Sequence, residues 1–187
     1  MIQKKILLLL FICSCCLMTT AQPPQRQTIS TSEPSRVNSV FLGVSGGLSS
    51  FHFISQLLDT HFIGYFGQAG AFVFVTENIT LGADYAYLFF NGKDSIRNFA
   101  MDEVLISGAF HFDSPLNLHI SLGFGYYGEP DGSHFGLVPS IGIMPRIAKN
   151  IYFKARGSAA FFDIGGQVFK IEAGLTFMVF QHKPIKR

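Results

Sequence analysis

Charged side chains inside apolar segments are the first candidates for a functional site in this sequence. Asp84, Lys154, Arg156, Lys170 and Glu172 interrupt segments in which apolar residues recur at every second position. If these segments are strands, the five charges share a face with small and polar residues and oppose the apolar face. The pattern predicts a structural ion-pair cluster inside the fold, and the functional alternative is an ion path or a gate.

Two histidines, His111 and His119, form a second candidate. Both lie on the polar face of their segments, and the turn 113–117 separates the two segments. We therefore expect the two imidazoles to be direct neighbours. Two imidazoles can help to hold a metal ion when a third ligand is near, but a hydrogen-bonded structural pair is the interpretation we adopt, so no metal site is predicted.

A third candidate is the pair His119 and Ser121, two residues apart on one face. A His-x-Ser pair also occurs in outer-membrane lipid A deacylases, in which a carboxylate orients the histidine and the serine attacks an acyl ester. Here the pair faces the same side as the glycines, away from the apolar face. We therefore predict no catalytic residues and a protein that is not an enzyme, with an acyl hydrolase as the alternative.

Motifs that bind cofactors are absent from the sequence. It contains no glycine-rich phosphate loop, no HExxH, no paired CxxC and no dinucleotide fingerprint, so we expect no cofactor. Removing Lys4 and Lys5 with an N-terminal signal leaves 12 of the 14 basic residues, which equals the 12 acidic residues. A neutral chain has no electrostatic footprint for nucleic acid.

The segments that carry these residues are predicted to be β-strands. The stretch LHISLGFGYY, residues 118–127, places its large apolar side chains on one face and His119, Ser121, Gly123 and Gly125 on the other. Ten residues are enough for a tilted strand to cross a bilayer. Similar alternation, separated by turn residues, predicts eight strands, at residues 40–49, 62–75, 79–89, 104–112, 118–127, about 135–147, 151–162 and from 166 to about 180.

Three further features of this pattern concern the loops, one strand face and two prolines. Residues 50–61 and 91–103 are predicted to be loops, and the inward face of the strand 62–75 cannot be assigned because both faces are apolar. Pro139 and Pro145 lack a donor for the sheet, so a bulge or a local break is expected at each.

The ends of the chain differ from its body. Residues 1–21 have a basic start, an apolar core and the small-residue site Thr19-Thr20-Ala21, which predicts a cleaved signal peptide. It holds all three cysteines, and lipidation at Cys15 is the alternative. Residues 22–39 predict a flexible leader, residues 40–180 the barrel and residues 181–187 a short polar tail. Only 14% of the chain is charged, against roughly 25% in an average soluble domain.

The segment 40–180 resembles the small OmpA/OmpX-type outer-membrane β-barrels of Gram-negative bacteria. The resemblance implies an all-β, eight-stranded antiparallel up-and-down transmembrane barrel. It also implies residence in the outer membrane, with membrane lipid and the barrel assembly machinery as partners. The expected role is a contribution to envelope integrity or surface contacts through the extracellular loops. A small pore and a lipocalin-type soluble barrel are alternatives, and the seven residues after Phe180 depart from the family's usual terminal aromatic residue.

The register of the last two strands can also be predicted. Both place their inward residues at even numbers, so directly opposed numbers must have an even sum. A three-residue turn at 163–165 pairs Phe162 with Gly166 and sets Arg156 opposite Glu172. We expect a charge-assisted contact there, with Asp84 across the lumen as the further partner of Lys154 or Arg156.

Overall fold

The computed structural model describes residues 36–54, 59–92, 98–129, 132–162 and 166–181. The predicted signal peptide, the lipidation alternative at Cys15, the turn 163–165 and nearly all of the leader and the tail lie outside these residues. Within the described ranges, no helix has the length and hydropathy needed to cross a membrane.

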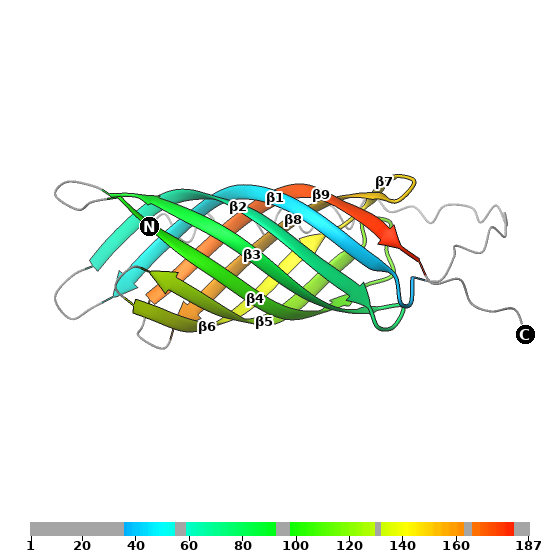
Figure 1. Cartoon of the computed structure of the whole chain (residues 1–187), viewed down its shortest axis with the longest axis horizontal. Coiled ribbons are helices and arrows are strands. Elements are labelled where there is room, and N and C mark those ends of the chain that lie inside the picture. Colours follow the sequence, from blue (N-terminus) through cyan, green and yellow to red (C-terminus); the bar gives the residue numbers. More distant parts are fainter. Residues whose placement is uncertain (1–35, 55–58, 93–97, 130–131, 163–165, 182–187) are drawn as a thin grey trace, which may run out of the picture. The chain divides into compact units, whose positions relative to one another are not determined.

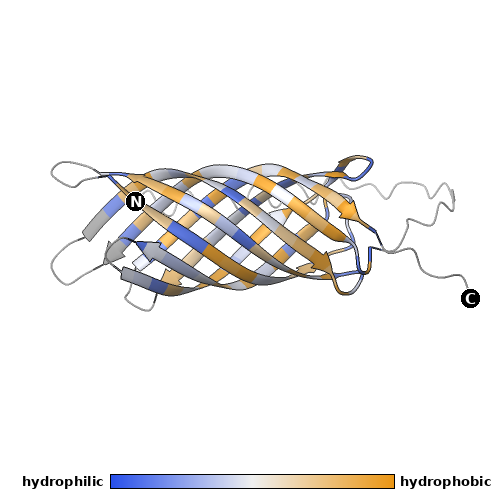
Figure 2. Cartoon of the chain, viewed as in Figure 1, coloured by the Kyte–Doolittle hydropathy of each residue, from blue (hydrophilic) through white to orange (hydrophobic). Residues whose placement is uncertain are grey.

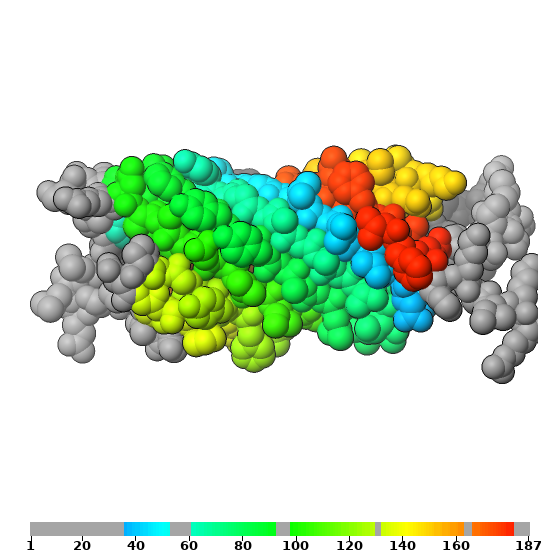
Figure 3. Space-filling view, viewed as in Figure 1, coloured from blue at the N-terminus to red at the C-terminus, as the bar shows by residue number. Residues whose placement is uncertain are grey.

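The barrel consists of antiparallel strands, most of which pair with their neighbours in chain order. The first strand pairs with the last, from Val40 opposite Phe180 to Phe53 opposite Gly166, and this pairing closes the sheet (Figure 1). Figure 3 shows the same closure on the outer surface, where the last strand (red) lies beside the first (blue). The strands are β1 (Val40–Ile54), β2 (Asp59–Phe74), β3 (Ile79–Asn91), β4 (Phe99–His111), β5 (Leu118–Glu129), β6 (Gly132–Ile143), β7 (Arg146–Ala148), β8 (Ile151–Phe162) and β9 (Gly166–Phe180).

Eight positions in the wall accommodate these nine strands, because β6 and β7 pair in succession with β8. The break between them falls at Met144 and Pro145, as predicted for Pro145. The expectation for Pro139 is met only in part. Register with β8 is the same on both sides of Pro139, so there is no bulge, but the pairing lapses between Leu137 and Ser140. A proline inside a strand has no N–H to donate to its neighbour.

The predicted faces are confirmed. In β5 the large apolar residues at even positions are exposed on the outside, and His119 and Tyr127 are buried inside. Figure 2 shows hydrophobic and hydrophilic residues alternating along the barrel wall. Pairing with β1 and β3 settles the inward face of β2, which the sequence left open: Phe62, Phe66, Gln68 and Phe74 are buried.

The two predicted loops are wrong in their bounds. β1 runs to Ile54 and β2 begins at Asp59, so most of the segment 50–61 is strand. β4 begins at Phe99, so residues 99–103 of the predicted loop 91–103 are also strand. These strand ends, which the sequence predicts to be loops, are extended because strands on both sides pair with them. Phe51, for example, lies opposite Phe62 and Val168.

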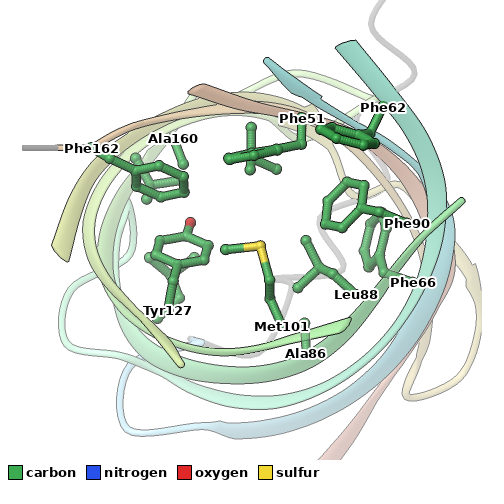
Figure 4. Close-up of a cluster of buried hydrophobic side chains, with 13 residues drawn as sticks. Phe51, Phe62, Phe66, Ala86, Leu88, Phe90, Met101, Tyr127, Ala160 and Phe162 are labelled. Atoms are coloured by element: carbon green, nitrogen blue, oxygen red, sulfur yellow. The ribbon is translucent and has the colours of Figure 1, made fainter. Parts of the chain in front are cut away.

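Two clusters of buried apolar side chains lie inside the barrel. We call the end of the barrel that carries Val40 and Phe180 the terminal end, and the opposite end the loop end. The terminal-end cluster comprises Phe41, Phe74, Met144 and Tyr152. The loop-end cluster is larger and projects inward from many strands (Figure 4); it comprises Phe51, Phe62, Phe66, Ala86, Leu88, Phe90, Met101, Leu105, Tyr127, Val138, Ala160, Phe162 and Val168.

The outer surface carries a band without charge on β4. Asp102 and Asp113 are exposed at its two ends, and the outward residues between them run from Val104 to Phe112. Eight residue steps at about 3.4 Å, tilted by roughly 40°, span about 21 Å along the barrel axis. This is close to the apolar band of about 25 Å on outer-membrane barrels. At the Asp102 edge of the band, the Tyr85 hydroxyl donates to Asp102 Oδ1 at 2.5 Å.

Candidate functional site

Between the two apolar clusters lies a set of six charged side chains that we call the lumen charge cluster. Five of them, Asp84, Lys154, Arg156, Lys170 and Glu172, are those that the sequence predicts, and all five project inward from β3, β8 and β9. The sixth is Glu103 of β4. Three cations therefore face three carboxylates, and the cluster is neutral as a whole.

Arg156 is the centre of one half of the cluster. Its Nε lies 2.8 Å from Glu172 Oε1, and its Nη1 donates to Asp84 Oδ2 at 3.2 Å. Its Nη2 donates at 3.3 Å both to Glu172 Oε2 and to Gln68 Oε1. The planar guanidinium therefore joins β8 to three other strands, β2, β3 and β9, with charge-assisted bonds to the two carboxylates.

Glu172 has two cationic partners. Besides Arg156, Lys154 Nζ lies 2.9 Å from Glu172 Oε1. The Ser45 hydroxyl of β1 donates to Glu172 Oε2 at 3.4 Å. Glu172 is 3% exposed, so a carboxylate there is tolerable only with such partners.

The other half of the cluster is the pair Lys170 and Glu103. Lys170 Nζ contacts Glu103 Oε2, and the Tyr127 hydroxyl donates to Glu103 Oε1 at 2.7 Å. Lys170 Nζ also lies 5.5 Å from the centre of the Phe66 ring. Both ionic side chains are 1% exposed, so the pair sits directly against the loop-end cluster.

Three of the charged side chains lie opposite glycines. In the pairing of the strands, Asp84 lies opposite Gly70, Lys154 opposite Gly174, and Arg156 opposite Gly142. A Cβ atom at Gly70 would lie 1.9 Å from Asp84 Oδ1. The interior of an eight-stranded barrel is just wide enough for side chains, and Asp84 occupies space that Gly70 leaves empty.

The predicted register of the last two strands is the one found. Arg156 lies opposite Glu172, Lys170 opposite Ser158, and Lys154 opposite Gly174. Asp84, expected across the lumen, contacts Arg156.

The sequence prediction of this site omits Glu103, which it assigns to the loop 91–103, and also Gln68 and Tyr127. The signal for Glu103 was available: Met101, Glu103 and Leu105 continue the inward parity of β4 toward its N-terminal end.

The two histidines are neighbours, as expected. His111 and His119 lie directly opposite each other, with ring centres 5.1 Å apart and planes at 30°. His111 shares hydrogen bonds of 3.1 Å with Thr80 Oγ1 and with Asn117 Oδ1. Among the described residues, no group of three His, Cys, Asp or Glu side chains is arranged to hold a metal ion.

The His119 and Ser121 pair lacks the geometry of a serine hydrolase. Ser121 Oγ shares a hydrogen bond with Ser140 Oγ, and no contact in the described part of the chain joins a carboxylate to His119. His119 Nδ1 is buried and makes no hydrogen bond of normal geometry there. The pair also faces the lumen, away from the apolar outer surface.

Two cavities lined by described residues lie beside the lumen charge cluster. The larger, of about 50 Å³, is lined by Asp84, Lys154 and Arg156 and by the terminal-end residues Phe72 and Met144, and further by Ala71, Thr80, Gly82, Ser107, Ala109, His111, His119 and Ser121. The smaller, of about 10 Å³, also borders Asp84 and Lys154 and is lined by Gln68 and Thr176. Gln68 Nε2 and Thr176 Oγ1 are buried without a partner among the described residues, and a space of this size is sufficient for one water molecule.

The fold defines the class of protein: an eight-stranded antiparallel barrel with an apolar outside and a filled, ionic inside, which is the architecture of the small outer-membrane barrels. No protein-family model matches the sequence, and no curated protein is significantly similar to it.

Solved structures with this fold include proteins of Neisseria, Pseudomonas aeruginosa and Yersinia pestis. Neisserial surface protein A is 13% identical, with a TM-score of 0.56, over 74% of this chain and 96% of that one. OprG, an outer-membrane protein of Pseudomonas aeruginosa, is 9% identical, with a TM-score of 0.53, over 79% and 100%. Ail, the attachment invasion locus protein of Yersinia pestis, is 12% identical, with a TM-score of 0.51, over 75% and 98%. At these identities the likeness concerns the fold.

Proposed function

We propose that this protein is a non-enzymatic outer-membrane β-barrel whose lumen does not conduct, and that it contributes to envelope integrity or to surface contacts through its loop end. In this proposal the chain is exported by a signal peptide that is cleaved after Ala21. Its partners are membrane lipid, the barrel assembly machinery and a surface ligand of unknown identity. The fold that it shares with outer-membrane proteins supports this location.

The observation that carries the non-conducting role is the three-layer filling of the lumen. A permeating ion must pass the terminal-end cluster, then the lumen charge cluster and finally the loop-end cluster. Separating an ion pair in the middle layer is unfavourable, because a buried charge that loses its partner lowers stability by about 3 to 5 kcal/mol. The packed lumen therefore favours a structural or adhesive role over a pore.

The outer surface supports a position in the membrane. Large apolar side chains are exposed there in the middle of the wall, among them Ile106 at 67%, Phe124 at 73% and Ile171 at 74%. Exposed apolar area of this extent is rare on a soluble monomer. A lipocalin-type barrel would face water with this surface, which makes it the less favoured alternative.

The loop end offers less connecting chain for surface contacts than the sequence predicts. Four residues separate β1 from β2, and seven separate β3 from β4. The ends of the strands themselves, such as the outward residues His52 and His61 with ring centres 5.8 Å apart, therefore belong to the proposed contact surface.

Three measurements test the proposal. Membranes from cells that produce the full chain are washed with alkaline carbonate, and we expect the protein to stay with the membrane until detergent is added; release by the wash would contradict the location. In planar bilayers the purified protein should give no steady conductance, and a stable ion-sized step would contradict the filled lumen. Acyl release from lipid A should be absent, and release that Ser121→Ala abolishes would establish the hydrolase alternative.

A further inference from the structure

Asp102 is a carboxylate on the outer surface of β4, at the loop-end edge of the uncharged band. Its side chain is exposed, and the next outward residue toward the middle of the wall is Val104. The Tyr85 hydroxyl donates to its Oδ1 at 2.5 Å. The contacts described for Asp102 include no lysine or arginine and leave Oδ2 unused. The carboxylate therefore keeps a full negative charge and accepting capacity toward a ligand from outside.

Three described tyrosines surround this carboxylate. Tyr87 lies directly opposite Asp102 on β3, and Tyr85 follows two residues away on the same face. On β5, the residue opposite Asp102 is Gly128. A Cβ atom at Gly128 would lie 3.5 Å from Tyr126 Cε1 and 4.0 Å from Asp102 Cβ. The Tyr126 ring therefore lies over the glycine, beside the carboxylate.

The tyrosine rings remain accessible. Tyr85 and Tyr87 are each 51% exposed and Tyr126 is 42% exposed. The Tyr126 ring packs against Phe135, with ring centres 5.4 Å apart and planes at 60°, which fixes its position. Tyr87 lies opposite Gly67, where an added Cβ would meet no atom within 4 Å. The site is thus an open carboxylate bordered by aromatic rings.

This combination suits an organic ammonium group. The face of a tyrosine ring attracts a cation, and the carboxylate supplies the opposite charge and a charge-assisted hydrogen bond. A hard metal ion takes six or more oxygen ligands, whereas no group of three metal-binding side chains forms among the described residues. An anion would be repelled by Asp102.

The apolar surface next to the site favours a lipid as the source of the ammonium group. From Asp102 toward the middle of the wall, the outward residues of β4 and β5 are uncharged and exposed, including Val104 at 44%, Ile106 at 67% and Phe124 at 73%. A lipid whose headgroup lies at Asp102 can place its acyl chain along these side chains. A soluble amine would leave them unused.

We propose that the site at Asp102 binds the ammonium headgroup of one lipid of the ethanolamine type. The carboxylate accepts a hydrogen bond from the ammonium group, and the rings of Tyr87 and Tyr126 border the same cation. This inference rests on the membrane position of the proposed function, and it names one lipid class that the barrel would hold at its loop end.

The test uses lysophosphatidylethanolamine as the probe, and lysophosphatidylglycerol with the same acyl chain is the comparison lipid. The refolded full chain is kept in maltoside micelles, which carry no charge, and the amide resonance of Gly128 is followed by NMR. We expect a saturable shift with one ethanolamine lipid per barrel, bound about fivefold more tightly than the glycerol lipid. Free ethanolamine should bind more weakly, because it has no chain to pack on the apolar band.

Four variants separate this site from general binding to the outer surface. Asp102→Asn and Tyr126→Leu should each weaken binding of the ethanolamine lipid about fivefold. Asp113→Asn removes the exposed carboxylate at the other edge of the band. Tyr65→Leu removes an exposed tyrosine that packs against Phe89 on the neighbouring strand. Both of these control variants should bind the lipid as the wild-type protein does.

Several results would overturn the proposal. Equal affinity for the two lysolipids, unchanged binding in Asp102→Asn, or an equal loss in Asp113→Asn would show that the lipid is held by the apolar surface alone. Free ethanolamine that binds as tightly as the lysolipid would refute the assignment to a lipid. If Asp102→Asn does not fold, Tyr126→Leu and the comparison of the two lysolipids on the wild-type protein decide the question. Release of the protein by the carbonate wash would instead refute the membrane position itself.

Discussion

The pair Lys170 and Glu103 allows the sharpest test of how the lumen is stabilised. Both side chains are 1% exposed, and their described polar partners are each other and the Tyr127 hydroxyl. Lys170→Met leaves the Glu103 carboxylate buried with one neutral donor, and Glu103→Gln leaves the Lys170 ammonium buried beside a neutral amide. Each single substitution should lower the free energy of unfolding by about 3 to 5 kcal/mol.

The double variant should be more stable than either single variant. With both charges removed, no ion is buried at this pair, and the amide oxygen that Glu103→Gln introduces can still accept from the Tyr127 hydroxyl. The remaining loss of stability, about 1 to 3 kcal/mol, comes from the amide N–H₂ group that Glu103→Gln introduces, because this group is buried with fewer hydrogen-bond partners. The two substitutions should therefore be strongly non-additive, as expected for residues in direct contact.

Equilibrium unfolding in urea, with the protein in lipid vesicles, measures this cycle. The chain contains no tryptophan, so circular dichroism and the difference in gel mobility between folded and unfolded barrels are suitable signals. Losses in the double variant that equal the sum of the single losses would refute the reasoning, because they would show that the two charges do not depend on each other.

Two further predictions concern space and lipid exposure. Gly70→Ala should destabilise the barrel by about 1 to 3 kcal/mol, because its Cβ would lie 1.9 Å from Asp84 Oδ1, whereas Gly67→Ala, with open space around its Cβ, should be neutral; similar unfolding curves for both would contradict the packing argument. Ile106→Lys places a charge at the middle of the outer wall and should lower stability in vesicles by about 2 to 4 kcal/mol, while Ser133→Lys near the loop end should change it by about 0 to 1 kcal/mol. Equal losses at the two positions would contradict the proposed membrane band.

The amino-acid pattern alone was enough to locate most of the strand residues and to assign the inward face of strands such as β5. A period of two is a local property, so residues 118–127 reveal their inward side without knowledge of any partner. The register of the β8–β9 hairpin was also predictable, because parity and a short turn restrict the pairing, and Arg156 indeed lies opposite Glu172. Proline chemistry located the break at Pro145 because a missing N–H is a property of the residue.

Features that depend on closure of the barrel could be learned only from the tertiary structure. The inward face of β2 follows from its two neighbours, since its own residues are apolar on both sides. The strand ends near Phe51 and Glu103 look like loops in sequence, and they are extended because adjacent strands supply their hydrogen-bond partners. The contact of Lys170 with Glu103 joins β9 to β4 across the lumen. Such distances are set by the stagger of the strands around the barrel, which no local pattern encodes.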